Sequence, residues 1–139
     1  MSWLPRETVV VPIDFSEDSF AAIDVALEMG ADLHVIHVLP TLEPNDPGVI
    51  WATVDDQSRI EHATEAIHKE LAARGHNGLQ VAIRFGDPGH EIAQYAAEVN
   101  AGAIVLSSHG QSALMHLLIG SVAERIVRLA RCPVLVLKK

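Results

Sequence analysis

Aromatic side chains and cysteines are scarce in this chain of 139 residues. Phe, Trp and Tyr make up 4% of the sequence and hydrophobic residues 49%, so the core must be built from Val, Ile, Leu and Ala. The single cysteine, Cys132, excludes an internal disulfide and a metal site made of several cysteines. A lone thiol fits a reducing compartment, and we expect a cytoplasmic protein.

Basic residues are also in short supply. Lys and Arg number 10 against 18 Asp and Glu, which gives a formal net charge of −8. A nucleic-acid-binding face needs clustered positive charge, so we expect no nucleic acid partner. The charge is uneven, because residues 1–69 carry 3 basic and 13 acidic side chains, whereas residues 70–139 carry 7 basic and 5 acidic ones. The second half is therefore where an anion would bind.

Long apolar runs are missing from the sequence. None approaches the roughly 18 residues that a membrane-spanning helix needs. Arg6 and Glu7 also interrupt the start too early for a secretory signal. We therefore expect no membrane partner.

Short apolar runs do alternate with amphipathic stretches along the whole chain. The runs typical of buried strands are 8–13, 33–39, 79–85, 103–106 and 133–137, and the helical stretches are 16–29, about 60–74, 90–100 and 121–130. This alternation predicts a single α/β domain over 1–139, a doubly wound five-stranded parallel sheet with helices on both faces. The proline-containing connection 40–56 is long, which predicts a lid or a flap.

Polar and glycine residues follow the first and fourth predicted strands, where ligands bind in open α/β sheets. Asp14 leaves the first strand, Ser107 to Gly110 leave the fourth, and Gly120 with Ser121 precede the last helix. Backbone N–H groups at a helix start attract anions without a lysine. The GxxxxGK[ST] and GxGxxG phosphate-binding patterns are absent, so neither of those designs applies.

Five strings carry a resemblance to a known family: VVPIDFSEDS, LHVIHV, GDPGHEI, SSHGQS and GSVAERIVRLARCPVLVLK. In this order and spacing the chain resembles the universal stress protein family over nearly its whole length. ATP-binding members share a GxxG pattern, nine further residues and then G[ST]. That pattern falls here on Ser107, Gly110, Gly120 and Ser121, with Ser107 in place of the first glycine.

The resemblance implies a site for ATP, AMP or another adenine nucleotide, with Mg²⁺ bound through the phosphates. Asp14 and its neighbours would hold the nucleoside, the Val38 backbone would meet the adenine edge, and the glycine segments would meet the ribose and phosphates. The implied binding residues are Pro12, Ile13, Asp14, Val38, Ser107, His109, Gly110, Gly120, Ser121 and Val122. No catalytic residue and no metal held directly by side chains are expected.

The resemblance also implies the strand order 3-2-1-4-5 and a homodimer formed through Val134 to Leu137 on the last strand. The leading functional expectation is an ATP-binding regulatory protein of the stress response whose contact with an unknown protein partner depends on the nucleotide. Two alternatives stay open: a nucleotide-free dimeric adaptor, favoured by Ser107 and by Ala113 where glycine is common, and a slow ATPase.

Several individual residues also have simpler interpretations. Asp14 can merely cap the first helix, and Cys132 is typical of a small boundary residue. His34 and His37 are three apart in a strand, so they point to opposite faces and do not pair as metal ligands. Arg125, Arg128 and Arg131 lie towards the end of the last helix, where cations favour the helix dipole, although they also have the length to reach phosphates.

Overall fold

Five parallel strands form one sheet with the order β3-β2-β1-β4-β5, as the sequence analysis predicted. The computed structural model describes residues 8–29, 32–41, 55–108 and 120–138. The strands are β1 (Thr8–Pro12), β2 (Asp32–Leu39), β3 (Gln80–Phe85), β4 (Ala103–Ser107) and β5 (Val134–Leu137). The helices are α1 (Glu17–Glu28), α2 (Asp56–Ala73), α3 (Pro88–Glu98) and α4 (Ser121–Leu129).

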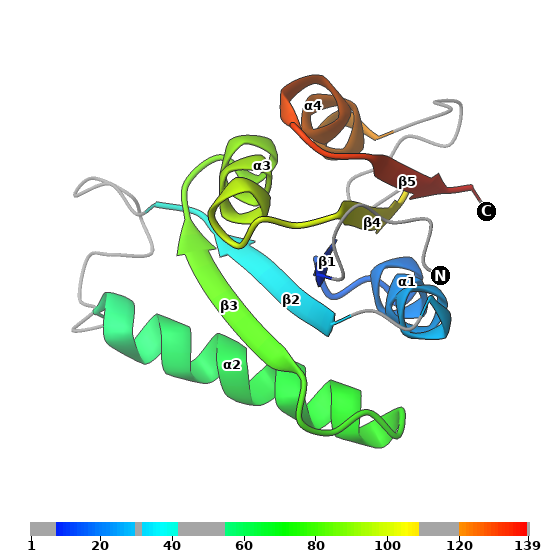
Figure 1. Cartoon of the computed structure of the whole chain (residues 1–139). Coiled ribbons are helices and arrows are strands. Elements are labelled where there is room, and N and C mark those ends of the chain that lie inside the picture. The colour runs from blue at the N-terminus through cyan, green and yellow to red at the C-terminus, as the bar shows by residue number, and fades with distance from the viewer. Residues whose placement is uncertain (1–7, 30–31, 42–54, 109–119, 139) are drawn as a thin grey trace.

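The helices cover both faces of the sheet (Figure 1). Successive side chains of a strand point to opposite faces, so β1 supplies both cores. Val9 and Val11 pack with α1 and α2, whereas Val10 packs with α3 and α4. All three side chains are fully buried. The continuous apolar run of β1 is therefore explained by two hydrophobic layers, one on each side of the central strand.

Local sequence signals determine where most helices begin and end. The Ser16 hydroxyl accepts a hydrogen bond from the Ser19 backbone N–H at 3.1 Å, which caps α1. Gly75 follows the last turn of α2 with φ +83°, a conformation that glycine adopts without strain. Among the described helices, none is both long and apolar enough to cross a membrane.

The start of α3 differs from the prediction. The sequence predicts a helix that begins at His90, but α3 already includes Pro88 and Gly89. Asp87 is the N-cap, and its carboxylate accepts a hydrogen bond from the His90 N–H at 3.0 Å. Proline is well suited to the first helical position because it needs no N–H partner there. The helix ends at Glu98, two residues earlier than expected.

Candidate functional site

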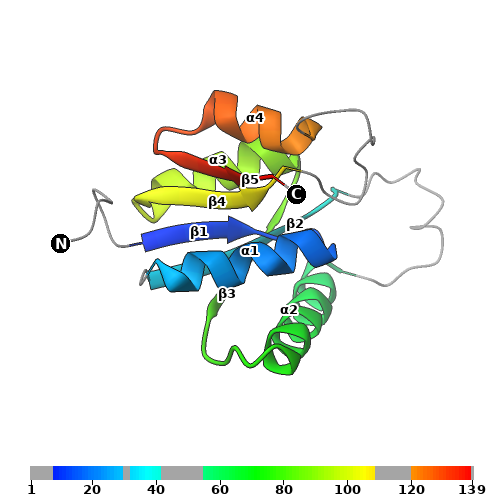
Figure 2. The same cartoon turned by 90° about the vertical axis from the view of Figure 1, so that its right-hand side faces the viewer.

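The carboxyl ends of β1 and β4 lie side by side in the middle of the sheet. Val9 pairs with Ala103 and Val10 with Ile104, and the strand order changes direction between these two strands. All strands are parallel, so α1, α3 and α4 begin at the same edge, on the right of Figure 2. This is the position at which open α/β sheets bind ligands.

The turn after β1 is built around Asp14. The Asp14 carboxylate accepts a hydrogen bond from the Ser16 N–H at 3.0 Å, and the Asp14 N–H donates to the Ser19 hydroxyl at 3.3 Å. Phe15 between them has φ +66°, which is uncommon for a residue with a side chain. The simpler interpretation of Asp14 as the cap of α1 is therefore wrong in detail. Ser16 caps the helix, and Asp14 shapes the turn.

His37 of β2 holds the same turn from the neighbouring strand. Its Nδ1 lies 2.7 Å from the Ile13 carbonyl oxygen, and its ring meets the Phe15 ring edge-on with centroids 4.8 Å apart. A carbonyl oxygen only accepts hydrogen bonds, so Nδ1 must carry the proton. The contact adds to the pairing of β1 with β2, which continues past β1 through the bond from the Ile13 N–H to the Ile36 carbonyl at 2.8 Å. Sequence reasoning missed it, because no local signal joins residues 24 positions apart.

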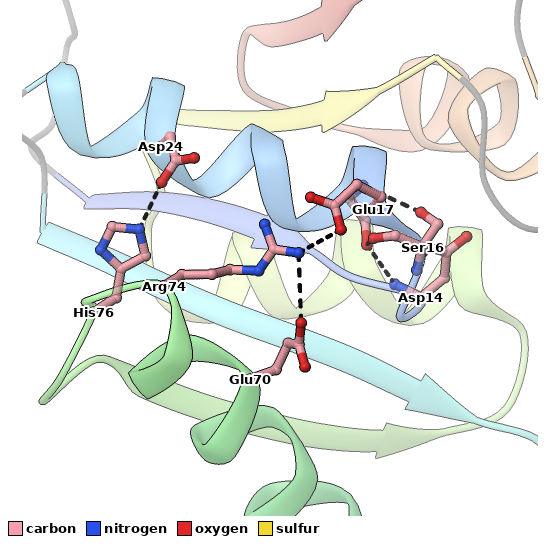
Figure 3. A network of polar contacts seen from close by, with 8 residues as sticks. Asp14, Ser16, Glu17, Asp24, Glu70, Arg74 and His76 are labelled. Carbon is pink, nitrogen blue, oxygen red and sulfur yellow. Dashed lines mark hydrogen bonds and ion pairs between the residues drawn. The ribbon is translucent and has the colours of Figure 1, made fainter.

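Arg74 at the end of α2 ties that helix to the start of α1 (Figure 3). Its Nη2 donates to Glu17 at 2.6 Å and lies 3.5 Å from Glu70, and its guanidinium stacks over Phe20 at 4.8 Å from the ring centroid. The hydrogen bond from Arg74 holds the pKa of the Glu17 carboxyl below its usual value. The helix that follows the Asp14 turn is thus fixed at its first residue.

A second contact, made by a residue just after α2, lies further along α1. His76 Nε2 lies 2.6 Å from the Asp24 carboxylate. Figure 3 shows the two side chains pointing toward each other. The two links join α1 to the end of α2 at both halves of α1. They therefore anchor the scaffold beneath the Asp14 turn.

The start of α4 joins the ends of β4 and β5. The Gly120 N–H donates to the Ser108 carbonyl, and the Ser108 N–H donates to the Leu137 carbonyl at 2.8 Å. Side chains cap the other three described helices, through Ser16, Asp55 and Asp87. Gly120 is the N-cap residue of α4, and no side chain in the described parts of the chain caps this helix. Its first-turn N–H groups are those that a helix leaves without intrahelical partners.

A shallow groove of about 280 Å³ runs between the starts of α3 and α4. Its lining residues are Asp87, Gly89, Ser121, Val122, Glu124, Arg125 and Arg128. Arg125 Nε donates to the Asp87 carboxylate at 2.7 Å. Arg128 donates to Glu124 at 2.9 Å within α4. Arg125 lies in the middle of α4 and not at its end, so its expected role at the helix C-terminus is wrong.

The structure brings most of the predicted residues to one edge of the sheet. These are Pro12, Ile13 and Asp14 after or at the end of β1, Val38 in β2, Ser107 in β4, and Gly120, Ser121 and Val122 at the start of α4. His109, Gly110 and Ala113 lie outside the described residues, as does most of the predicted 40–56 lid.

His34, His37 and Cys132 take the simpler roles. His34 Nδ1 lies 2.8 Å from the Tyr95 hydroxyl on the α3 side, whereas His37 faces Phe15, so the prediction of opposite faces is confirmed. Cys132 is partly buried against the α3 and α4 core. Over residues 8–29, 32–41, 55–108 and 120–138, no three His, Cys, Asp or Glu side chains come together as a metal site.

The fold is a doubly wound α/β sheet whose order reverses between β1 and β4, and α4 starts beside that point with no cap from a described side chain. The family model described as "Universal stress protein family" matches residues 5–138. The chain belongs to the universal stress protein family.

Relatives in sequence and structure agree with this assignment. The chain is 32% identical to universal stress protein MJ0531 of Methanocaldococcus jannaschii over 140 aligned positions, which cover 94% of this chain and 81% of the relative. The structure resembles universal stress protein UspA from Lactobacillus plantarum with a TM-score of 0.74 and 25% identity, over 95% and 98% of the two chains. It also has the fold of a universal stress protein solved in complex with cAMP, with a TM-score of 0.63 and 23% identity over 94% and 95%.

Proposed function

We propose that this chain is a regulatory protein of the stress response that binds an adenine nucleotide, ATP foremost, at the carboxyl edge of β1 and β4. The observation that carries the proposal is the start of α4. Gly120 has no side chain to cap the helix, and its own N–H is already used by Ser108. Ser121 and Val122, which carry the next N–H groups, line the groove between α3 and α4. Such N–H groups with the positive end of the helix dipole suit a phosphate.

The remaining residues of the edge fit the nucleoside end of such a ligand. Ile13 is buried, Asp14 is held in its turn by Ser16, and Val38 is partly buried against the α3 and α4 core. We assign the adenine edge to the Val38 backbone and the ribose to Asp14. Mg²⁺ would be held through the phosphates, because the described residues offer no side-chain cluster for it. These contacts support binding, and we propose no catalytic residue.

The nucleotide test is isothermal titration calorimetry of the full chain with ATP and Mg²⁺, and with AMP and cAMP in parallel. The relative solved with cAMP makes that nucleotide a relevant competitor. We expect saturable binding of ATP. Asp14→Asn keeps an oxygen for the Ser16 hydrogen bond while removing the charge, so it should weaken binding and leave the fold intact. No binding at millimolar nucleotide by a folded protein would overturn the proposal.

A nucleotide-free adaptor is the second candidate function, and Ser107 is the residue that favours it. Its side chain stands where the ATP-binding pattern has glycine, at the end of β4. Ser107→Gly discriminates between the two functions. If the protein binds nucleotide and the Ser107 side chain only narrows the site, the glycine variant should bind ATP more tightly than the parent. If the protein is an adaptor, neither form should bind ATP. Mass spectrometry of the purified protein supplies a direct readout: a copurified adenine nucleotide supports the binder, and its absence from both Ser107 forms supports the adaptor.

Turnover is tested separately from binding. Release of phosphate from ATP above background, lost in Gly120→Val, would identify a slow ATPase in place of a pure binder. The Val side chain would crowd the start of α4 where the phosphates are assigned.

We further propose that the protein acts as a homodimer through β5, which is an outer strand of the sheet. Leu135 on that strand is 37% exposed, so it offers an apolar side chain to a second copy of the strand. An apolar edge strand readily pairs with another strand. A second protein partner whose contact depends on the bound nucleotide completes the proposed regulatory role.

A further inference from the structure

The groove between α3 and α4 contains an ion pair that the proposed nucleotide site does not use. Arg125 projects from the second turn of α4, and its Nε donates to Asp87 at the start of α3 (2.7 Å). Both side chains are about half exposed, at 52% and 51%. Ser121 and Val122, which we assign to the phosphates, line the same groove. The pair therefore lies next to the proposed phosphate end of the site.

Helical geometry places Arg125 within reach of that end. Residues four apart in a helix are neighbours on its surface, so Arg125 stands one turn behind Ser121. The stem of Arg125 passes over Gly89, where even a Cβ atom would come within 2.7 Å of its Cγ and Cδ. The missing side chain at position 89 thus lets the arginine stem lie against the start of α3, where both residues line the groove. The Nε bond to Asp87 uses one of the five guanidinium donors and neither Nη group.

The two partners of the ion pair depend on it unequally. Asp87 also accepts the His90 N–H at 3.0 Å as the cap of α3, so it keeps a hydrogen bond when Arg125 leaves. That backbone bond, with the help of Arg125, holds the pKa of the Asp87 carboxyl below its usual value. Asp87 is consequently ionised at neutral pH and competes with any other anion for the arginine. A terminal phosphate carries more negative charge than one carboxylate and presents several oxygens to a guanidinium.

The second arginine of the groove is placed differently. Arg128 forms its ion pair within α4, with Glu124 one turn earlier, and 69% of its side chain is exposed. A local pair of this kind contributes little and is not linked to the start of α3. Replacing Arg128 therefore serves as a control, because it removes a positive charge from α4 without breaking the ion pair of Arg125 with Asp87.

We propose that Arg125 is a specificity-determining residue that favours nucleotides with a longer phosphate chain, and that Asp87 holds it until such a ligand arrives. On binding, the guanidinium exchanges the Asp87 carboxylate for the terminal phosphate, while Asp87 remains the cap of α3. The inference rests on the proposed nucleotide function and adds a preference among ligands: ATP over AMP. The two partners have opposite effects, since Arg125 supplies the attraction and Asp87 competes with it.

Calorimetric titration with ATP, ADP and AMP, each with Mg²⁺, tests the inference on the full chain. Arg125→Gln should reduce the affinity for ATP about three- to tenfold, the range for a partly exposed charge-assisted hydrogen bond, and leave AMP unchanged. Asp87→Asn keeps the helix cap, because Asn is as good an N-cap as Asp. It should tighten ATP binding about threefold by removing the competing charge. Arg128→Gln should leave the ratio of the affinities for ATP and AMP unchanged.

The outcomes separate this inference from the proposed function. If the parent protein binds no nucleotide, both are overturned. If ATP and AMP bind but the ratio of their dissociation constants is the same in Arg125→Gln and the parent, only the role of Arg125 is overturned. If Asp87→Asn also loses affinity for ATP, the ion pair only supports the fold, and the proposed role of Arg125 is overturned. Urea denaturation of each variant then measures how much stability the ion pair contributes.

Discussion

Gly89 gives the most direct test of how closely α3 and α4 pack. An added Cβ atom at this position would lie 2.7 Å from Cγ and Cδ of Arg125 and 2.8 Å from its Cβ. A new rotamer can move Cγ and Cδ, but the Cβ of Arg125 moves only with the α4 backbone. Gly89→Ala must therefore push the two helices apart by several tenths of an ångström.

The magnitude follows from two opposing effects. Inserting a methyl group into a close contact costs about 1–3 kcal/mol. Alanine has a higher helix propensity than glycine and should stabilise the fold by up to about 1 kcal/mol here, because Gly89 lies within α3 and has no positive φ. The net expectation is a loss of about 1–2 kcal/mol in the free energy of unfolding, or roughly 3–10 °C in Tm. Chemical denaturation and a thermal melt followed by circular dichroism measure both values.

A double-mutant cycle identifies the cause. Arg125→Gly removes all three contacting atoms, so Gly89→Ala made in that background should be neutral or stabilising. The coupling between the two substitutions should then amount to about 1–3 kcal/mol. The steric argument is refuted if Gly89→Ala leaves the parent unchanged, or if it destabilises both backgrounds equally.

Three further predictions concern other parts of the molecule. The depressed pKa of Glu17 means that its bond to Arg74 stabilises the fold above the ordinary value of 4.5 and is lost as the pH falls through the lower folded value. Denaturation midpoints measured from pH 7 to pH 3 should therefore fall less steeply in Arg74→Met than in the parent; parallel curves would contradict this. Ile126→Ala removes a fully buried side chain and should cost about 2–5 kcal/mol in urea denaturation, whereas Val127→Ala, at a position 48% exposed, should stay within about 0.5 kcal/mol. Leu135→Lys should convert the proposed dimer to a folded monomer in light scattering at micromolar concentration, and a parent that is itself monomeric there would rule out the β5 interface.

Much of the fold could be predicted from the hydrophobic periodicity of its strands and helices. The buried run of β1 and the capped start of α1 are visible in the sequence because apolar spacing and a serine before an acidic turn are local properties. The error at α3 has a local cause as well. Pro88 and Gly89 are typical of turns, and only the cap at Asp87 with its bond to the His90 N–H shows that they belong to the helix.

The candidate site was predicted less completely, since its residues depend on long-range contacts. The resemblance pointed to Asp14, Val38 and the start of α4, which the parallel sheet then brought to one edge. The hydrogen bond from His37 to Ile13 crosses between strands, and sequence spacing carries no sign of it. The same holds for the ion pair of Asp87 with Arg125, because helix periodicity alone does not show which neighbour a surface arginine meets.

By itself the sequence determined the class of fold, the aliphatic nature of the core and the family, because periodicity, composition and motif order are written along one dimension. The tertiary structure decided which charges meet. It joined α1 to α2 through Arg74, and it placed Arg125 across Gly89 against Asp87. Those contacts depend on how helices far apart in the chain pack on a shared sheet. That packing is determined by the side chains of the whole core together and not by any local segment.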